Sequence, residues 1–121
     1  MSEQARWAVE LYDLLNGSSP LVEFIEQQSN RNQAKIYAEL DDMTEFGLMP
    51  RGDKLKHLED KLWELRFRGE GLHFRLIYFA YTGRKIVILH GFCKKTRKTP
   101  RRELNTARSR YHDYLERHNL E

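Results

Sequence analysis

Three segments rich in β-branched and aromatic residues follow one another in the second half of the chain, and they constrain the fold more than any other feature. They are Leu62–Phe67, Leu72–Tyr81 and Lys85–Phe92. Short glycine-containing connections at 69–71 and 82–83 separate them, which is typical of antiparallel hairpins. The middle segment is nearly all apolar, so we expect it to be buried on both faces at the centre of a sheet.

Helices are predicted before and after these strands in the sequence. The pair Ser19-Pro20 provides a cap and a first residue for a helix that ends near Ser29-Asn30. A second helix is predicted from Gln33 to Phe46, because apolar residues recur there at spacings of three and four. A last helix is predicted from Pro100 to His118, with Thr99 as its cap.

The order of these elements predicts the fold class. A first strand is expected from Arg6 to Tyr12, and residues 48–58 are interpreted as a loop because they contain Pro50 and Gly52. The order is then strand, helix, helix, three antiparallel strands, helix (β-α-α-β-β-β-α). We therefore expect a single α+β domain over residues 1–121. Its small, mostly antiparallel sheet would have helices packed on one face and be partly open on the other.

The charged residues are divided unevenly along the chain. Residues 1–60 contain 6 Lys and Arg and 12 Asp and Glu, a net charge of −6, whereas residues 61–121 contain 15 and 6, a net charge of +9. A basic face attracts polyanions, and phosphate contacts dominate the affinity of proteins for nucleic acids. The asymmetry indicates a nucleic acid or a large acidic partner; the alternative is a set of solvated surface charges.

Several classes of protein do not fit the sequence. No run of apolar residues approaches the roughly 20 needed to cross a bilayer. The first residues lack the pattern of a signal peptide, so we expect a cytoplasmic protein that is not bound to a membrane. Cys93 is the only cysteine, which rules out an internal disulfide and a cysteine-based zinc site.

Arg66 and Arg75 are the clearest candidates for a functional site. Strand alternation puts Glu64, Arg66 and Arg68 on one face of their strand. Arg75 lies among residues that should be buried, where a guanidinium is costly to desolvate unless it is paired or lines a cleft. Either Arg75 contacts a phosphate, to which its fork of donors is suited, or it pairs with Glu64 or another carboxylate on an adjacent strand.

A basic run leads from the last predicted strand into the last helix. Its members are Lys94, Lys95, Arg97, Lys98, Arg101 and Arg102. A helix N-terminus can bind phosphate through its backbone N–H groups and its dipole, so this run is a candidate RNA-contacting segment. The alternative is that the run serves only solubility.

Histidine provides a second kind of candidate. His90 shares a strand face with Ile88 and Phe92, and it could act as a general acid or base. The alternative is a hydrogen-bonded core histidine, which is the commoner role for a lone histidine in a strand. The other histidines show no metal-ligand spacing, and no metal or cofactor site is predicted; they are His57, His73, His112 and His118.

Four segments together resemble a known family. They are LWELR at Leu62–Arg66, FRLIYF at Phe74–Phe79, IVILHGF at Ile86–Phe92 and KKTRKTPRREL at Lys94–Leu104. In combination they are similar to the HigB-type toxins of the RelE/ParE superfamily, in its phage-related branch. The likeness in the order of elements extends over about residues 5–118, and the specific motifs are confined to 57–108.

This resemblance implies a RelE-like toxin that enters the ribosomal A site and cleaves mRNA by attack of a 2′-hydroxyl, without metal or cofactor. Its usual partner is a small helix-turn-helix antitoxin. Carried over to this sequence, Arg75 is the strand arginine that stabilises the phosphate, and Arg66 with Lys94 or Lys95 adds further cations. Lys98 contacts RNA or takes part in proton transfer. The remaining candidates are His90 for catalysis and Arg68, Arg97, Arg101 and Arg102 for RNA binding.

Two other functions stay open at this point. The ParE branch of the same superfamily inhibits DNA gyrase without cleaving RNA, and such an inhibitor does not need a phosphate site. A phage-derived protein that binds nucleic acid without catalysis is the other alternative. The basic segment and the two strand arginines favour the nuclease.

Overall fold

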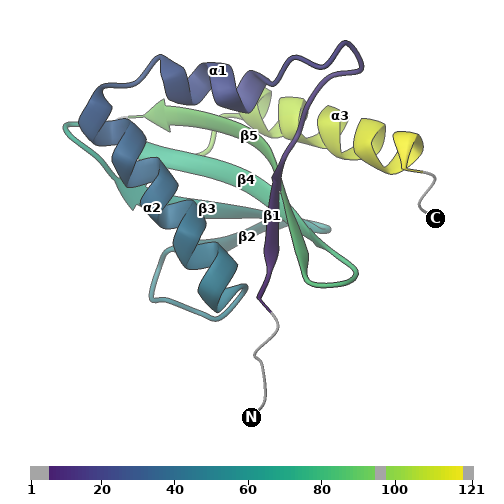
Figure 1. Ribbon diagram of the computed structural model, residues 1–121, viewed down its shortest axis with the longest axis horizontal. Helices are drawn as coiled ribbons and strands as arrows, with labels where there is room; N and C mark the ends of the chain where they lie inside the picture. Colours follow the sequence, from purple (N-terminus) through teal and green to yellow (C-terminus); the bar gives the residue numbers. More distant parts are fainter. Residues whose placement is uncertain (1–5, 95–97, 119–121) are drawn as a thin grey trace.

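The computed structural model of the chain describes residues 6–94 and 98–118. Over these residues the chain forms a five-stranded mixed sheet and three α-helices (Figure 1). The elements are β1 (Ala8–Leu11), α1 (Pro20–Glu26), α2 (Asn30–Phe46), β2 (Leu55–Glu59), β3 (Leu62–Arg68), β4 (His73–Tyr81), β5 (Lys85–Lys94) and α3 (Arg101–Arg117). The α+β class is confirmed.

The strands lie in the order β1-β5-β4-β3-β2. β1 runs parallel to β5, and the other three pairings are antiparallel. The three strands predicted from their apolar runs are confirmed, with β4 flanked by β3 and β5 as expected. β4 is almost wholly buried, which explains its nearly continuous apolar sequence.

The prediction of a loop over 48–58 is wrong in part, because β2 forms within it. Leu55 pairs with Leu65, and His57 pairs with Trp63. The segment is a short edge strand with exposed residues at its centre, so its own sequence carries little apolar alternation. Its strand conformation depends on hydrogen bonds to β3, which local sequence does not reveal.

N-terminal caps were predicted for α1 and α3, and the structure confirms only that of α1. The Ser19 hydroxyl accepts a hydrogen bond from the backbone N–H of Val22, 3.2 Å away, so the predicted cap of α1 is confirmed. The expected cap of α3 is wrong: its N-cap is Pro100, with no side-chain capping bond. Thr99 instead donates its hydroxyl hydrogen to Glu64 of the sheet.

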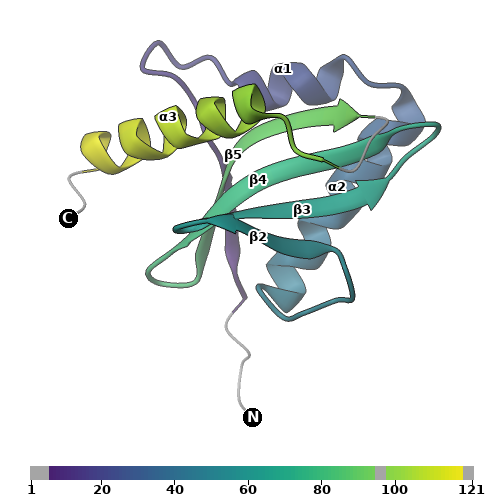
Figure 2. The ribbon, with the colours of Figure 1, turned by 180° about the vertical axis from the view of Figure 1, so that it is seen from behind.

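The helices cover the two faces of the sheet unequally (Figures 1 and 2). α1 and α2 pack on one face, as predicted, where Phe24 lies edge-on to Phe74 with ring centroids 6.2 Å apart. α3 crosses the opposite face, where Tyr111 meets Phe79 at 4.8 Å. α3 lies over β4 and β5 (Figure 2), and Thr99, just before its N-terminus, reaches Glu64 of β3.

None of the helices within 6–94 and 98–118 has the length and hydropathy of a membrane-spanning segment.

Candidate nucleic-acid interface

The register of the sheet brings basic side chains from three strands together on the face that α3 crosses. Arg66 of β3 is opposite Arg75 of β4, and Arg68 is opposite His73. His73 is in turn opposite Lys94 of β5. Residues directly opposite each other in an antiparallel pair point to the same face with their Cβ atoms about 4.5–5.5 Å apart. The register therefore concentrates positive charge at one end of this face.

A pocket of about 300 Å³ lies at this end of the sheet. Its lining residues are Asp53, Lys54, Arg66, Phe67, Arg68, His73 and Arg75. Three of the predicted site residues, all arginines, thus line one pocket. Four cationic side chains and one carboxylate surround it, which suits an anionic ligand such as a phosphate.

The buried carboxylate of Glu64 organises the floor of this region. One of its oxygens lies 3.1 Å from Nη1 of Arg75 and 3.6 Å from Nε of Arg66. The other accepts a hydrogen bond of 2.8 Å from Thr99. Glu64 is 0% exposed and Arg75 is 2% exposed. The pairing of Arg75 with Glu64, predicted as an alternative to a phosphate contact, is therefore present, and Arg75 also lines the pocket.

Glu64 contacts the two strand arginines differently. Arg75 is held rigidly against a buried carboxylate that offsets its charge. The side chain of Arg66 is 22% exposed and reaches the same carboxylate only at 3.6 Å. Arg66 is therefore the more exposed of the two guanidinium groups, and Arg75 is the closer to the carboxylate of Glu64.

Lys54 enters the pocket from the segment before β2. Its Nζ donates a hydrogen bond of 2.8 Å to Oε2 of Glu39 on α2. Its backbone oxygen accepts a hydrogen bond of 2.7 Å from the N–H of Arg66. Glu39 is 2% exposed, so this ion pair anchors the rim of the pocket to the helix behind the sheet.

The basic run predicted to contact RNA lies beside the pocket where the structure describes it. Lys94, at the end of β5, donates from Nζ to the backbone oxygen of Lys98. Arg101 and Arg102 are exposed at the start of α3, and Nε of Arg102 lies 3.4 Å from Glu103. Lys95 and Arg97 lie outside the described residues. Lys98 is exposed.

His90 is held by α3 and does not line this pocket. Its Nε2 lies 2.6 Å from Glu103, and its Nδ1 lies 3.2 Å from Nη1 of Arg110. A guanidinium can only donate, so Nδ1 accepts and Nε2 carries the hydrogen that is given to Glu103. Burial lowers the pKa of His90, which favours the neutral ring. Both nitrogens are engaged, as in the core-histidine interpretation of the sequence.

Three residues that line the pocket are not among the site residues predicted from the sequence: His73, Asp53 and Lys54. His73 stands two residues before Arg75 in the same strand and therefore shares its face, and this alternation is a signal in the sequence that points to it. Asp53 and Lys54 carried none, because they reach the pocket through a turn and an edge strand that only the tertiary structure defines.

No group of three or more His, Cys, Asp or Glu side chains that could hold a metal ion occurs within 6–94 and 98–118.

The family model described as "Phage derived protein Gp49-like (DUF891)" matches residues 23–112 of the 121. The matched range includes every residue that lines the pocket. No curated protein matches the chain.

Proposed function

The chain belongs to the family of Gp49-like phage-derived proteins, and we propose that it is the toxin of a toxin–antitoxin pair, a HigB-like endoribonuclease that cleaves mRNA on the ribosome. Its family is associated with RelE/ParE-like toxins. The observation that carries the proposal is the pocket where three arginines from β3 and β4 converge. The α+β fold with its mixed sheet is consistent with a RelE-like protein.

The pocket supplies what RNA cleavage by a 2′-hydroxyl requires of a protein. As the 2′-oxygen bonds to phosphorus, negative charge grows on the non-bridging phosphate oxygens. Arg66 and Arg68 would contact these oxygens from β3, while Arg75 adds positive charge from the floor. Glu64 holds Arg75 and approaches Arg66 before RNA arrives, so little reorganisation is needed in the transition state.

The surroundings of the pocket provide further contacts for the RNA chain. Lys94 and Lys98 meet at the segment before α3, and Arg101 and Arg102 project from the first turn of that helix. Basic side chains in a first turn oppose the helix dipole, and a bound phosphate would offset this. The mRNA, the ribosomal A site and a helix-turn-helix antitoxin are the partners of this function.

The decisive experiment is controlled expression in bacteria with mapping of mRNA ends. The wild-type chain should arrest growth and produce cuts within translated codons. Arg66→Gln should reduce cleavage about a hundredfold to a thousandfold, because one charged donor to the phosphate is lost. Arg108→Gln is the matched control: Arg108 is on α3, pairs with Glu59 and does not line the pocket.

Growth arrest with intact transcripts would refute the nuclease. Inhibition of gyrase supercoiling by the purified chain, without RNA cleavage, would instead support a ParE-like inhibitor. Salt-sensitive RNA binding without growth arrest would support a phage-derived protein that binds nucleic acid without catalysis.

A further inference from the structure

The proposed cleavage needs a proton for the oxygen that leaves phosphorus, and few residues lining the pocket can provide one. Arginine and lysine ordinarily hold their protons too tightly at neutral pH, and an aspartate carboxylate ordinarily has none to give. The side chain of Phe67 has no acidic proton. Imidazole, which ordinarily gains and loses a proton near neutral pH, is the remaining chemistry, and His73 provides it.

The position of His73 suits contact with the same phosphate as the arginines. It is the first residue of β4, opposite Arg68 on one side and Lys94 on the other. It points to the face of Arg75, two residues further along the strand. The 2′-oxygen, the phosphorus and the 5′-oxygen of one linkage lie within a few ångströms, so a residue beside the phosphate-binding arginines can reach the leaving oxygen.

The ring of His73 also differs from the other strand histidines in its contacts. Within residues 6–94 and 98–118, no side-chain hydrogen bond or ion pair engages either nitrogen of His73. His90 has both nitrogens occupied by Glu103 and Arg110. The Nε2 of His57 lies 2.8 Å from the backbone oxygen of Asp60. His73 lines the pocket and is only half-buried, so its ring is accessible to RNA.

We propose that His73 is the general acid of the cleavage reaction. The inference rests on the proposed nuclease function. The 2′-oxygen forms a bond to phosphorus, its proton passes to Asp53 or to water, and the bond from phosphorus to the 5′-oxygen breaks. The protonated imidazole of His73 gives its proton to that 5′-oxygen. The products are a 2′,3′-cyclic phosphate and a 5′-hydroxyl, and the ring regains a proton from water.

Other charged groups face His73 from every neighbouring element. They are Arg66 and Arg68 on β3, Arg75 on β4, Lys94 on β5, and Asp53 and Lys54 from the segment before β2. A phosphate bound among these cations would lie beside the ring of His73.

The test is cleavage of two mRNAs bound to ribosomes by the full-length protein. Each carries, in the A site, the codon that the wild-type chain cuts most in cells. One has an ordinary linkage at the cut site, and the other has sulfur in place of the 5′-oxygen. A thiolate leaves without a proton, so a missing general acid should matter only for the ordinary linkage.

His73→Gln should slow cleavage of the ordinary linkage about a hundredfold to ten-thousandfold, and it should cleave the sulfur-containing linkage almost as fast as the wild type. Arg66→Gln is the contrast, because stabilisation of the phosphate is needed for both leaving groups and both rates should fall. His112→Gln is the matched control: His112 is exposed on α3 and does not line the pocket.

Equal losses of His73→Gln on both mRNAs would overturn the assignment and leave the nuclease in place. Full activity of this variant on the ordinary linkage would do the same. If the wild-type chain cut neither mRNA, the proposed function would fail together with the inference. A thermal unfolding midpoint of His73→Gln close to that of the wild type checks that the fold is intact.

Discussion

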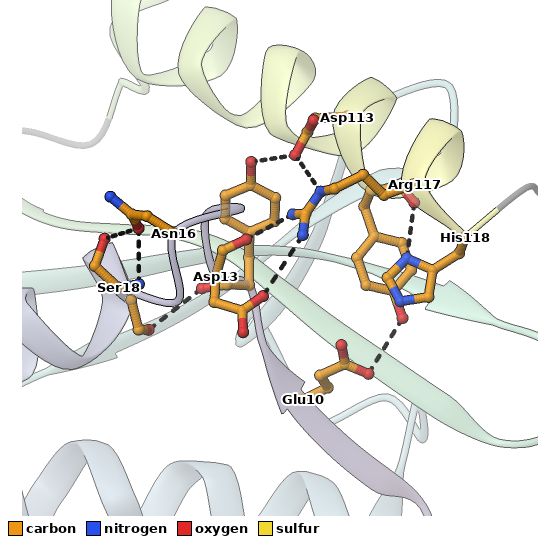
Figure 3. A network of polar contacts seen from close by, with 10 residues as sticks. Glu10, Asp13, Asn16, Ser18, Asp113, Arg117 and His118 are labelled. Carbon is orange, nitrogen blue, oxygen red and sulfur yellow. Dashed lines mark hydrogen bonds and ion pairs between the residues drawn. The ribbon is translucent and has the colours of Figure 1, made fainter.

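The two ends of α3 lie over two clusters of charged side chains that are built differently. Beyond its N-terminal end, arginines from β3 and β4 share the buried carboxylate of Glu64 beside an open pocket. Near its C-terminal end, Arg117 is surrounded by acceptors (Figure 3). Its Nε donates to Asp113 at 2.9 Å, and its Nη2 donates to the backbone oxygen of Asp13 at 2.6 Å.

The C-terminal cluster also ties the first strand and the loop after it to the helix. Tyr12 donates to Asp113 at 2.6 Å, and the guanidinium of Arg117 lies over its ring. Tyr114 donates to Glu10 of β1 at 3.1 Å. These contacts join residues about a hundred positions apart. Cations here form a structural joint between α3 and the N-terminal segment, whereas the pocket is lined by four Lys and Arg side chains and one carboxylate.

This difference predicts that the two clusters respond oppositely to mutation. Changes at the joint should alter stability and leave RNA cleavage intact. Changes to exposed pocket cations should alter cleavage and leave stability intact. Arg75 is the exception, because it lines the pocket and is also buried against the carboxylate of Glu64.

The largest effect on stability is expected for Arg75→Ala. Removing the guanidinium leaves the 0% exposed carboxylate of Glu64 without its closest cation, which should lower the free energy of unfolding by about 3–5 kcal/mol. Urea denaturation measures this. The double variant Glu64→Gln with Arg75→Met should cost less, since no buried charge remains. A single variant as stable as the wild type would contradict the structural role of Arg75.

Thr99→Val should have the next largest effect. It removes the hydroxyl that donates 2.8 Å to Glu64, and a hydrogen bond to a buried charged group contributes about 1.5–3 kcal/mol. Thr99→Ser keeps the donor and is the control. If valine and serine give the same unfolding free energy, the contact does not anchor the start of α3.

Tyr12→Phe tests the other cluster. The loss of one hydrogen bond to Asp113 should lower the free energy of unfolding by about 1 kcal/mol, because Asp113 is 37% exposed and water can replace the phenol. RNA cleavage should be unchanged. Arg66→Gln should behave in the opposite way, and a parallel loss of both properties in either variant would erase the distinction between the clusters.

The smallest effect concerns pH. The hydrogen bond from Tyr12, together with Arg117, holds the pKa of Asp113 below its ordinary value of 3.8. A carboxyl group whose pKa is lowered by folding contributes stability above its unfolded pKa and loses that contribution as pH falls through the folded pKa. The difference in unfolding free energy between the wild type and Tyr12→Phe should shrink below about pH 4. Urea denaturation at neutral and acidic pH decides it, and a constant difference would assign the effect of Tyr12 to packing alone.

Much of the fold was predictable because it is encoded locally. β3, β4 and β5 follow from apolar runs and glycine turns, and α1 follows from the pair Ser19-Pro20. Strand alternation also placed Glu64 and Arg66 on one face, which the structure confirms. Within that face, the pairing of Arg75 with Glu64 was one of two predicted alternatives.

Other features depend on partners far away in the sequence. β2 is a strand because β3 offers it hydrogen bonds, and Thr99 leaves the helix cap because Glu64 offers its hydroxyl a buried carboxylate. Glu103 and Arg110 of α3 contact the two ring nitrogens of His90. The register of β3, β4 and β5 puts His73 among the arginines. Local sequence thus accounts for most of the strands and helices and for the concentration of positive charge in the second half of the chain. The histidine and the acceptors that stand beside that charge are set by the register of the sheet and the path of α3, because both arise from contacts between distant residues.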